Sequence, residues 1–387
     1  MSKELKIGIV FTDHKTWTGG NYYLSNLLRS LSDYQGRISF SLVLFCNAED
    51  YDRALTLAND CGVKVFVVNR KTVFLERVLN KVYRLFGLRE PYPILPDSRH
   101  ADVVFPNAPK FIYGKIPHRM FWIPDFQEWH LPEFFTPEEI AARRKMQQNI
   151  ADQNATLVLS SRDSLKDFRN FFPDARAHAD VVHFAVIHPP YNNLSISDLR
   201  SKYGLPDKYF IAPNQFWAHK NHLTVIKAVE LSREQGDPFT VVFTGNEDDY
   251  RNPGYTANLK KYAEQNDLMD FVRFLGFIDR KEQLQLMNHA VAVIQPSAFE
   301  GWSTVIEDAK AMGQSILASS LEVHKEQLEN YKGESRLFET GNHSELYDSM
   351  REFTDRGFER NPTDYSDSVK KFGEDFLQVA VKTAERK

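Results

Sequence analysis

The sequence predicts an α/β protein of two Rossmann-like domains whose parallel sheets face each other across a cleft. Three observations support this prediction. Short β-branched apolar runs alternate with amphipathic segments, a stretch rich in Pro, Asn and Ser interrupts them near the middle, and 387 residues exceed one ordinary core. Ligands of open parallel sheets bind past the carboxyl ends of the strands. Two facing sheets would therefore hold two ligands on opposite walls, which suits a transfer reaction.

The first domain is expected to contain strands that are buried on both faces. Their residues are continuously apolar instead of alternating, as such strands require. The runs are Leu5–Phe11, Ser39–Cys46, Val63–Val68, Ala101–Pro106, Arg119–Ile123 and Ala155–Ser161. Amphipathic segments lie between several of them and predict covering helices.

The second domain is expected after a linker at Ile187–Lys208, where prolines, asparagines and serines replace the apolar pattern. The alternation then restarts, with helices between the strands. The predicted strands are Tyr209–Gln215, Phe239–Gly245, Phe271–Phe277, Val291–Ser297 and Ser315–Ser320. We expect domains at 1–190 and 191–365, and a last helix at 366–387 that crosses back to the first domain.

Composition excludes several classes of protein. The chain has 48 Lys and Arg against 52 Asp and Glu, a formal charge of −4, which argues against general nucleic-acid binding. Two cysteines form no disulfide framework, which fits a reducing compartment. No apolar run has the length of a signal peptide or of a membrane span. The expected location is the cytoplasm.

The segment from Pro296 to Gly313 carries the strongest functional signal. It follows a predicted strand and contains a bare carboxylate, Glu300, a Gly-Trp-Ser-Thr turn, and then a helix. Thr304 followed by Glu307 fits a capping box, in which Glu307 only ties back to the backbone. That account leaves Glu300 unexplained. The free N–H groups of a helix start bind anions, and an ionised acid accepts hydrogen bonds from sugar hydroxyls.

This segment resembles the signature of the retaining glycosyltransferases of family 4, which have the GT-B fold. In that family two glutamates stand with seven residues between them. The first contacts the donor sugar and the second contacts the ribose of the nucleotide. Glu300 matches the first, and the spacing places Asp308 at the second, one residue beyond Glu307. Both acids stay open for that role. The resemblance places the donor beside the turn formed by Gly301, Trp302, Ser303 and Thr304.

The segment from Asn214 to His222 resembles the family's Arg-and-Lys stretch, which neutralises the donor diphosphate. Lys220 matches the lysine, while Gln215 stands where arginine is usual. A lysine near a helix start gains nothing from the helix dipole, so an anion is expected between them. The alternative is a solvated surface lysine. The segment Leu275–Met287 resembles the stretch whose backbone holds the base, and we expect its side chains to pack.

Two stretches of the first domain complete the predicted site. Gly19 and Gly20 precede a helix, and glycine lets backbone approach a ligand closely; in the family this loop faces donor and acceptor. The family often has His-Asp in the region of Trp122–Phe135. Here Pro124 replaces the histidine and Asp125 remains, with His130 as a candidate substitute. Asp125 could also be only a turn former.

The resemblance implies a retaining hexosyltransferase that needs no metal and no cofactor. Its donor would be a GDP- or UDP-linked sugar, and its acceptor a hydroxyl of a glycan or lipid-linked glycan in surface polysaccharide assembly. Glu300, Asp125 and Lys220 are the expected catalytic residues. An epimerase or a phosphorylase is the rival among enzymes. The substitutions at Gln215 and Pro124 favour the other alternative, a degenerate nucleotide-sugar-binding protein without turnover.

A basic segment at Lys71–Arg89 bears on where the acceptor is found. It has five basic residues, one acid (Glu76), and apolar residues at helical spacing. It is expected to be either an ordinary helix packed on the first sheet or an interfacial helix that contacts anionic lipid. The second interpretation would place the enzyme at the inner face of the membrane.

Overall fold

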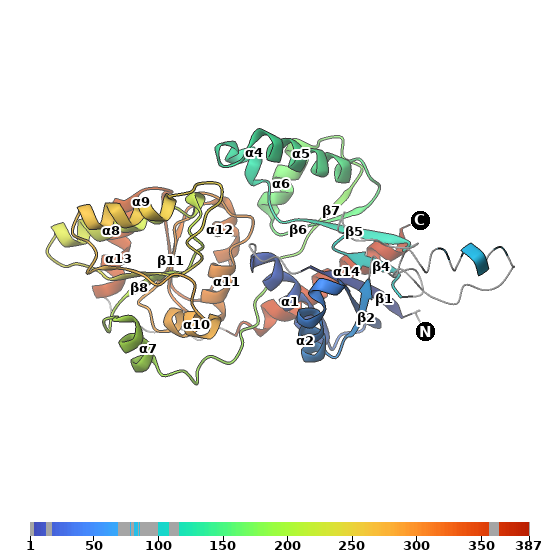
Figure 1. Ribbon diagram of the computed structural model, residues 1–387, viewed down its shortest axis with the longest axis horizontal. Coiled ribbons are helices and arrows are strands. Elements are labelled where there is room, and N and C mark those ends of the chain that lie inside the picture. The colour runs from blue at the N-terminus through green and yellow to red at the C-terminus, as the bar shows by residue number, and fades with distance from the viewer. Residues whose placement is uncertain are drawn as a thin grey trace.

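The computed structural model describes residues 4–12, 18–68, 78, 81–83, 85, 100–107, 116–355 and 364–386. These residues form two parallel sheets covered by helices, and the two halves of the molecule lie side by side in Figure 1. The predicted α/β fold of two Rossmann-like domains is therefore confirmed. The basic segment Lys71–Arg89 lies largely outside the described residues.

The first sheet has, among the described residues, the strand order β3-β2-β1-β4-β5-β6-β7, with all pairs parallel. Its strands are β1 Leu5–Phe11, β2 Phe40–Asn47, β3 Lys64–Val68, β4 Val103–Phe105, β5 His118–Ile123, β6 Thr156–Leu159 and β7 His178–Val181. Its helices are α1 Thr18–Ser32, α2 Tyr51–Cys61, α4 Gln127–His130, α5 Pro137–Ala151 and α6 Arg162–Phe171, with 3-10 turns η1 Ala48–Asp50 and η2 Pro132–Phe134.

The second sheet has the described strand order β10-β9-β8-β11-β12-β13, again parallel. Its strands are β8 Phe210–Ala212, β9 Val241–Phe243, β10 Val272–Phe274, β11 Val293–Gln295, β12 Ile316–Ser319 and β13 Ser335–Phe338. Its helices are α7 Ile196–Tyr203, α8 His222–Glu234, α9 Tyr255–Gln265, α10 Arg280–Asn288, α11 Thr304–Ala311, α12 Glu322–Leu328 and α13 His343–Asp355, with the 3-10 turn η3 Ala218–Lys220. Helices α8, α9 and α13 share one core with the sheet, and α7, α10 and α11 share another.

Two strands were missed in the sequence, β7 and β13, and both lie at the end of a sheet. An outer strand is covered less than a central one, so polar residues are tolerated in it. No residue of β7 is fully buried, and β13 buries only Phe338. Neither segment therefore shows the continuous apolar run by which the buried strands were recognised.

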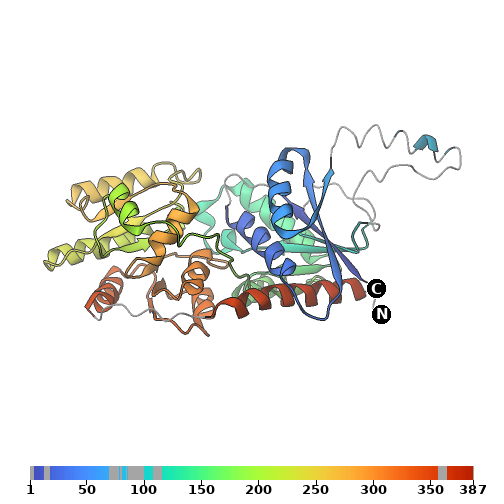
Figure 2. The ribbon, with the colours of Figure 1, turned by 90° about the horizontal axis from the view of Figure 1, so that it is seen from below.

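The last helix, α14 (Ser366–Glu385), returns from the second domain and packs on the first, as the sequence analysis expected. Figure 2 shows it in red along the first domain. Phe372, Phe376 and Leu377 are buried in the same core as α1 and α2, because they recur at the spacing of one helix face. The hydroxyl of Ser30 on α1 also donates to the carbonyl of Val369 at 2.7 Å.

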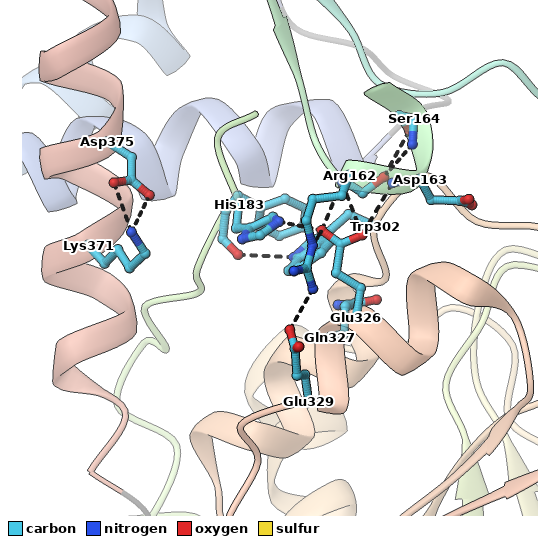
Figure 3. A network of polar contacts seen from close by, with 12 residues as sticks. Arg162, Asp163, Ser164, His183, Trp302, Glu326, Gln327, Glu329, Lys371 and Asp375 are labelled. Atoms are coloured by element: carbon cyan, nitrogen blue, oxygen red, sulfur yellow. Dashed lines mark hydrogen bonds and ion pairs between the residues drawn. The ribbon is translucent and has the colours of Figure 1, made fainter. Parts of the chain in front are cut away.

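A polar cluster joins α6 of the first domain to α12 of the second domain, and Figure 3 shows it. The carboxylate of Glu326 on α12 accepts hydrogen bonds from the backbone N–H groups of Arg162 and Asp163, at 2.8 to 3.2 Å, and so binds the N-terminus of α6 in the other domain. His183 lies 2.5 Å from the same carboxylate. Burial alone would raise the pKa of Glu326, but these bonds outweigh it and hold the pKa below its usual value. The cluster is thus one of the contacts that join the two domains.

Candidate active site

A cavity of about 230 Å³ lies between the carboxyl ends of the two sheets. It adjoins a second cavity of about 1460 Å³, and both are lined by residues of both domains. Most of the predicted site residues line the first cavity: Gly19, Asp125, Gln215, Lys220, Glu300, Gly301, Trp302, Ser303, Thr304 and Asp308. Gly20 lines the second cavity. Glu307 lines neither of them. The structure thus brings together residues that are up to about 290 positions apart in the chain.

Glu300 is the centre of the polar part of the cavity. Its Oε1 accepts three hydrogen bonds, from Lys220 Nζ at 2.5 Å, Gln295 Nε2 at 2.6 Å and Ser297 Oγ at 2.7 Å. The side chains of Glu300 and Lys220 are 9% and 16% exposed. Both partners of this ion pair are therefore nearly buried, yet both line the cavity. The alternative that Lys220 is a solvated surface residue is wrong.

Gly301 allows the two domains to touch. A Cβ atom on Gly301 would lie 2.3 Å from the carbonyl oxygen of Pro124 and 2.8 Å from the Cβ of Asp125. Those atoms belong to the first domain, and Gly301 belongs to the second. Only a residue without a side chain fits this contact, which brings Asp125 next to the Glu300 turn.

Asp125 is enclosed in the cleft and its carboxylate accepts the N–H of Gln127 at 3.1 Å. Burial raises the pKa of this carboxyl, and the nearby charge of Glu300 adds to the effect. The turn-forming role suggested by the sequence is thus present, and the same carboxyl also lines both cavities. The two roles do not exclude each other.

The capping box predicted for Thr304 and Glu307 is wrong. Helix α11 begins at Thr304, and its N-cap is Ser303, whose hydroxyl accepts the N–H of Ile306 at 3.3 Å. Ile306 therefore occupies the position that a capping-box acid would need. The Glu307 carboxylate points away from the cavity and accepts from Tyr365 OH at 2.5 Å.

Asp308, and not Glu307, faces the cavity. Its Oδ1 accepts from Arg280 at 2.6 Å and lies 3.0 Å from His188 Nε2, and its side chain is 1% exposed. Burial by itself would raise the pKa of Asp308. The Arg280 guanidinium and the hydrogen bond from His188 outweigh burial and hold the pKa below its usual value. Asp308 is consequently a carboxylate in this structure.

Mutation should distinguish the roles of Glu307 and Asp308. Glu307→Gln should lower the free energy of unfolding by about 1–3 kcal/mol, because Lys310 and Tyr365 lose a charged partner. Its affinity for a nucleoside diphosphate should stay near that of the wild type. Asp308→Asn should lower that affinity. Thermal unfolding and calorimetric titration of both variants check this, and equal affinity losses would contradict the different placement of the two acids.

His130 does not take the place of the missing histidine. Its Nε2 lies 2.6 Å from Asp167 Oδ2, and the imidazole lies outside the residues that line the two cavities. The hydrogen bond to Asp167 raises the pKa of His130. The described part of the chain contains no group of three or more His, Cys, Asp and Glu that could hold a metal ion.

The structure adds cavity residues that sequence reasoning missed. Arg280 and Gln283 lie in the segment expected only to pack, yet both line the first cavity. Tyr22, from the first domain, lies with its ring 5.0 Å from the guanidinium carbon of Arg280. A sequence signal for Arg280 does exist: Asp279 is the N-cap of α10, so Arg280 begins a helix at the end of a strand and loop.

Two facing parallel sheets, with carboxylates and cations gathered between their carboxyl ends, define the GT-B class of two-domain proteins. Within this class, residues 196–371 match the model of the family described as glycosyl transferases group 1. The match covers most of the second domain and less than half of the chain. None of the helices in the described part of the chain combines the length and the apolar content needed to span a bilayer.

One relative and two solved structures are similar to this chain. The O-antigen chain mannosyltransferase RfbU of Salmonella typhimurium is 27% identical over 140 residues, which span 36% of this chain and 37% of that protein. HepE of Anabaena, solved with UDP-glucose, has a TM-score of 0.62 at 18% identity over 98% of this chain and 95% of that one. A glycosyltransferase from Rickettsia africae has a TM-score of 0.60 at 14% identity, over 98% and 94%. At these identities the solved structures show the shared fold.

Proposed function

We propose that the protein is a retaining glycosyltransferase of family 4, which moves a sugar from a UDP- or GDP-linked donor to a hydroxyl of a glycan or lipid-linked glycan. The observation that carries the proposal is the buried pair of Lys220 and Glu300 at the open start of α11. A core would gain little from such a pair, because burying two charges costs about as much as their attraction returns. A donor that presents a diphosphate next to sugar hydroxyls would use both groups.

The diphosphate would bind at the start of α11. The N–H groups of Thr304 and Val305 have no hydrogen-bond partner among the described residues, and both residues line the cavity. Such N–H groups, at the positive end of the helix dipole, favour an anion. Lys220 would turn its ammonium group from Glu300 toward the phosphates. The Glu300 carboxylate would then be free to accept hydrogen bonds from the sugar.

The chemistry needs charge stabilisation more than it needs a base. The bond between the anomeric carbon and the diphosphate breaks, and a new bond forms to the acceptor oxygen on the same face of the sugar. The acceptor's proton passes to the leaving phosphate. Lys220 and the α11 N–H groups stabilise the negative charge that develops on the diphosphate. Glu300 and Asp125 face the side on which the sugar carbon becomes positive. We propose that this arrangement works without a metal ion or cofactor.

The known proteins support the substrate classes of this proposal. RfbU is named as a mannosyltransferase of O-antigen chains, and HepE was solved with UDP-glucose. For this chain they favour a hexosyl donor and an acceptor from surface-polysaccharide assembly. The cavity of about 1460 Å³ beside Asp125 offers room for that acceptor.

A donor panel tests the proposal. UDP- and GDP-linked hexoses are incubated with the protein and candidate glycan acceptors, with and without a chelator, and release of the nucleoside diphosphate is measured. NMR of the product gives the anomeric configuration, and retention with an unchanged rate in chelator is expected. If the protein binds nucleotide but releases no nucleoside diphosphate from any donor, the alternative is favoured, a degenerate nucleotide-sugar-binding protein. The substitutions at Gln215 and Pro124 are the sequence features that agree with this alternative.

Cytoplasmic location and contact with the inner face of the membrane are part of the proposal. The contact would use the basic segment Lys71–Arg89. Flotation with liposomes checks it, because binding should require anionic lipid and fade with added salt. Wild-type protein that stays unbound at low salt would contradict the contact.

Lys220→Ala should weaken the binding of a nucleoside diphosphate by about 10- to 100-fold, the range expected for a charge-assisted hydrogen bond. The corresponding nucleoside should bind the variant and the wild type equally, because it lacks the phosphates. Calorimetric titration measures both affinities. Lys227→Ala, on α8 outside the cavity, is the matched control. Unchanged affinity of Lys220→Ala for the diphosphate would contradict the role of Lys220.

A further inference from the structure

The cavity contains a second ion pair that mirrors the first. Lys220 pairs with Glu300, and Arg280 pairs with Asp308 at 2.6 Å. Among the described residues that line this cavity, these two side chains are the only lysine and arginine. His219 also lines it, but burial holds the pKa of its imidazole well below the usual value, so it is neutral.

The charge count makes Arg280 important. The lining contains two cations and three carboxylates, namely those of Asp125, Glu300 and Asp308. A donor diphosphate carries two negative charges, and Lys220 alone brings one positive charge that Glu300 already neutralises in part. The neutral Gln215 adds none. A dianion therefore needs a second cation in this cavity.

Arg280 lies close to the start of α11. Asp308 follows Thr304 by four residues, so the two side chains share one face of the helix. Side chains on a helix lean toward its N-terminus, and this tilt brings the Asp308 carboxylate near the first turn. Arg280, bonded to that carboxylate, is consequently near the free N–H groups of Thr304 and Val305.

The guanidinium of Arg280 is also held in one orientation and keeps donors for a ligand. Its NH1 donates to Gln283 at 2.8 Å and its NH2 to Asp308 at 2.6 Å, and the ring of Tyr22 lies 5.0 Å from its central carbon. An arginine has five N–H donors, and these two bonds engage two of them. The side chain is 22% exposed, toward the cavity that it lines.

We propose that Arg280, positioned by Asp308, is the second cation that binds the donor diphosphate, in place of the positive charge that Gln215 does not supply. This inference rests on the proposed function. It assigns Asp308 a second task, because the acid holds the arginine in addition to facing the ribose. Tyr22 belongs to the first domain, so its contact with Arg280 joins the proposed diphosphate site to the other wall of the cleft.

Binding of a phosphate series tests the inference. Uridine, UMP and UDP, and the guanosine series in parallel, are titrated calorimetrically into the wild type, Arg280→Gln and Arg280→Lys. Arg280→Gln should weaken diphosphate binding by about 10- to 100-fold and leave nucleoside binding unchanged. The diphosphate affinity of Arg280→Lys should lie between those of the wild type and Arg280→Gln, because lysine keeps the charge but not the planar set of N–H donors. Lys281→Gln is the matched control, since it removes one positive charge at the next residue of α10 and lies outside the cavity.

The outcomes separate this inference from the proposed function. If the wild type binds the diphosphate and Arg280→Gln binds it equally well, the inference is wrong and the proposed function stands. Equal losses for nucleoside and diphosphate would also overturn it, because they would show a role for Arg280 in shape or base contact only. If the wild type binds neither UDP nor GDP, the proposed function fails and the inference fails with it.

Discussion

Glu300→Gln should lower kcat by about 30- to 1,000-fold, which corresponds to about 2–4 kcal/mol of lost transition-state stabilisation. The change keeps the size of the side chain and removes the carboxylate charge that, in the proposed function, lies beside the reacting sugar. An amide oxygen can still accept from Gln295 and Ser297, so the turn before α11 should keep its shape. Nucleotide release from the best donor of the panel measures the effect.

The control for this variant is Glu322→Gln, which removes the same charge from an exposed side chain of α12. Its kcat should equal that of the wild type. Because Lys220 loses its charged partner, the free energy of unfolding of Glu300→Gln should fall by about 1–3 kcal/mol. Circular dichroism at the assay temperature should show the variant folded, which separates lost catalysis from lost folding. A kcat near the wild-type value for Glu300→Gln would show that the sugar reacts elsewhere in the cleft.

Gly301→Ala should lower kcat by about 100-fold, the cost expected when reacting groups are misplaced by about 1 Å. The added Cβ would overlap the carbonyl oxygen of Pro124, a backbone atom that no rotamer change can move. The two domains would have to separate, and Asp125 would leave the Glu300 turn. Affinity for the nucleoside diphosphate should change less than kcat, because Lys220 and α11 lie in the second domain.

Gly36→Ala is the matched control for Gly301→Ala. The three atoms nearest to its Cβ would all belong to the side chain of Tyr34, and Gly36 is exposed and lies outside the residues that line the two cavities. Small-angle scattering of Gly301→Ala should show a more open molecule than the wild type. Wild-type kcat in this variant would mean that the close contact between the domains is not needed for turnover.

Much of the fold followed from the sequence because buried parallel strands leave a continuous apolar pattern. Strands such as β1 and β11 lie within the ranges predicted for them. The predicted linker Ile187–Lys208 is partly wrong, because helix α7 lies within it and buries Leu199 in the second domain. The outer strands β7 and β13 were not predicted, because partly exposed strands tolerate polar residues and lack the continuous apolar pattern. The exact domain boundaries stay a prediction.

The sequence by itself determined the two-domain α/β fold and the local motifs at the strand ends, including Glu300 and Lys220, because both depend on patterns within a few residues. Only the tertiary structure decided that Asp308 faces the cavity and Glu307 faces Tyr365, since a one-residue step on a helix turns a side chain by about 100°. It likewise brought Arg280 to Asp308 and Gly301 to Pro124. Such pairs join elements from distant parts of the chain, and no local pattern records which of them will meet.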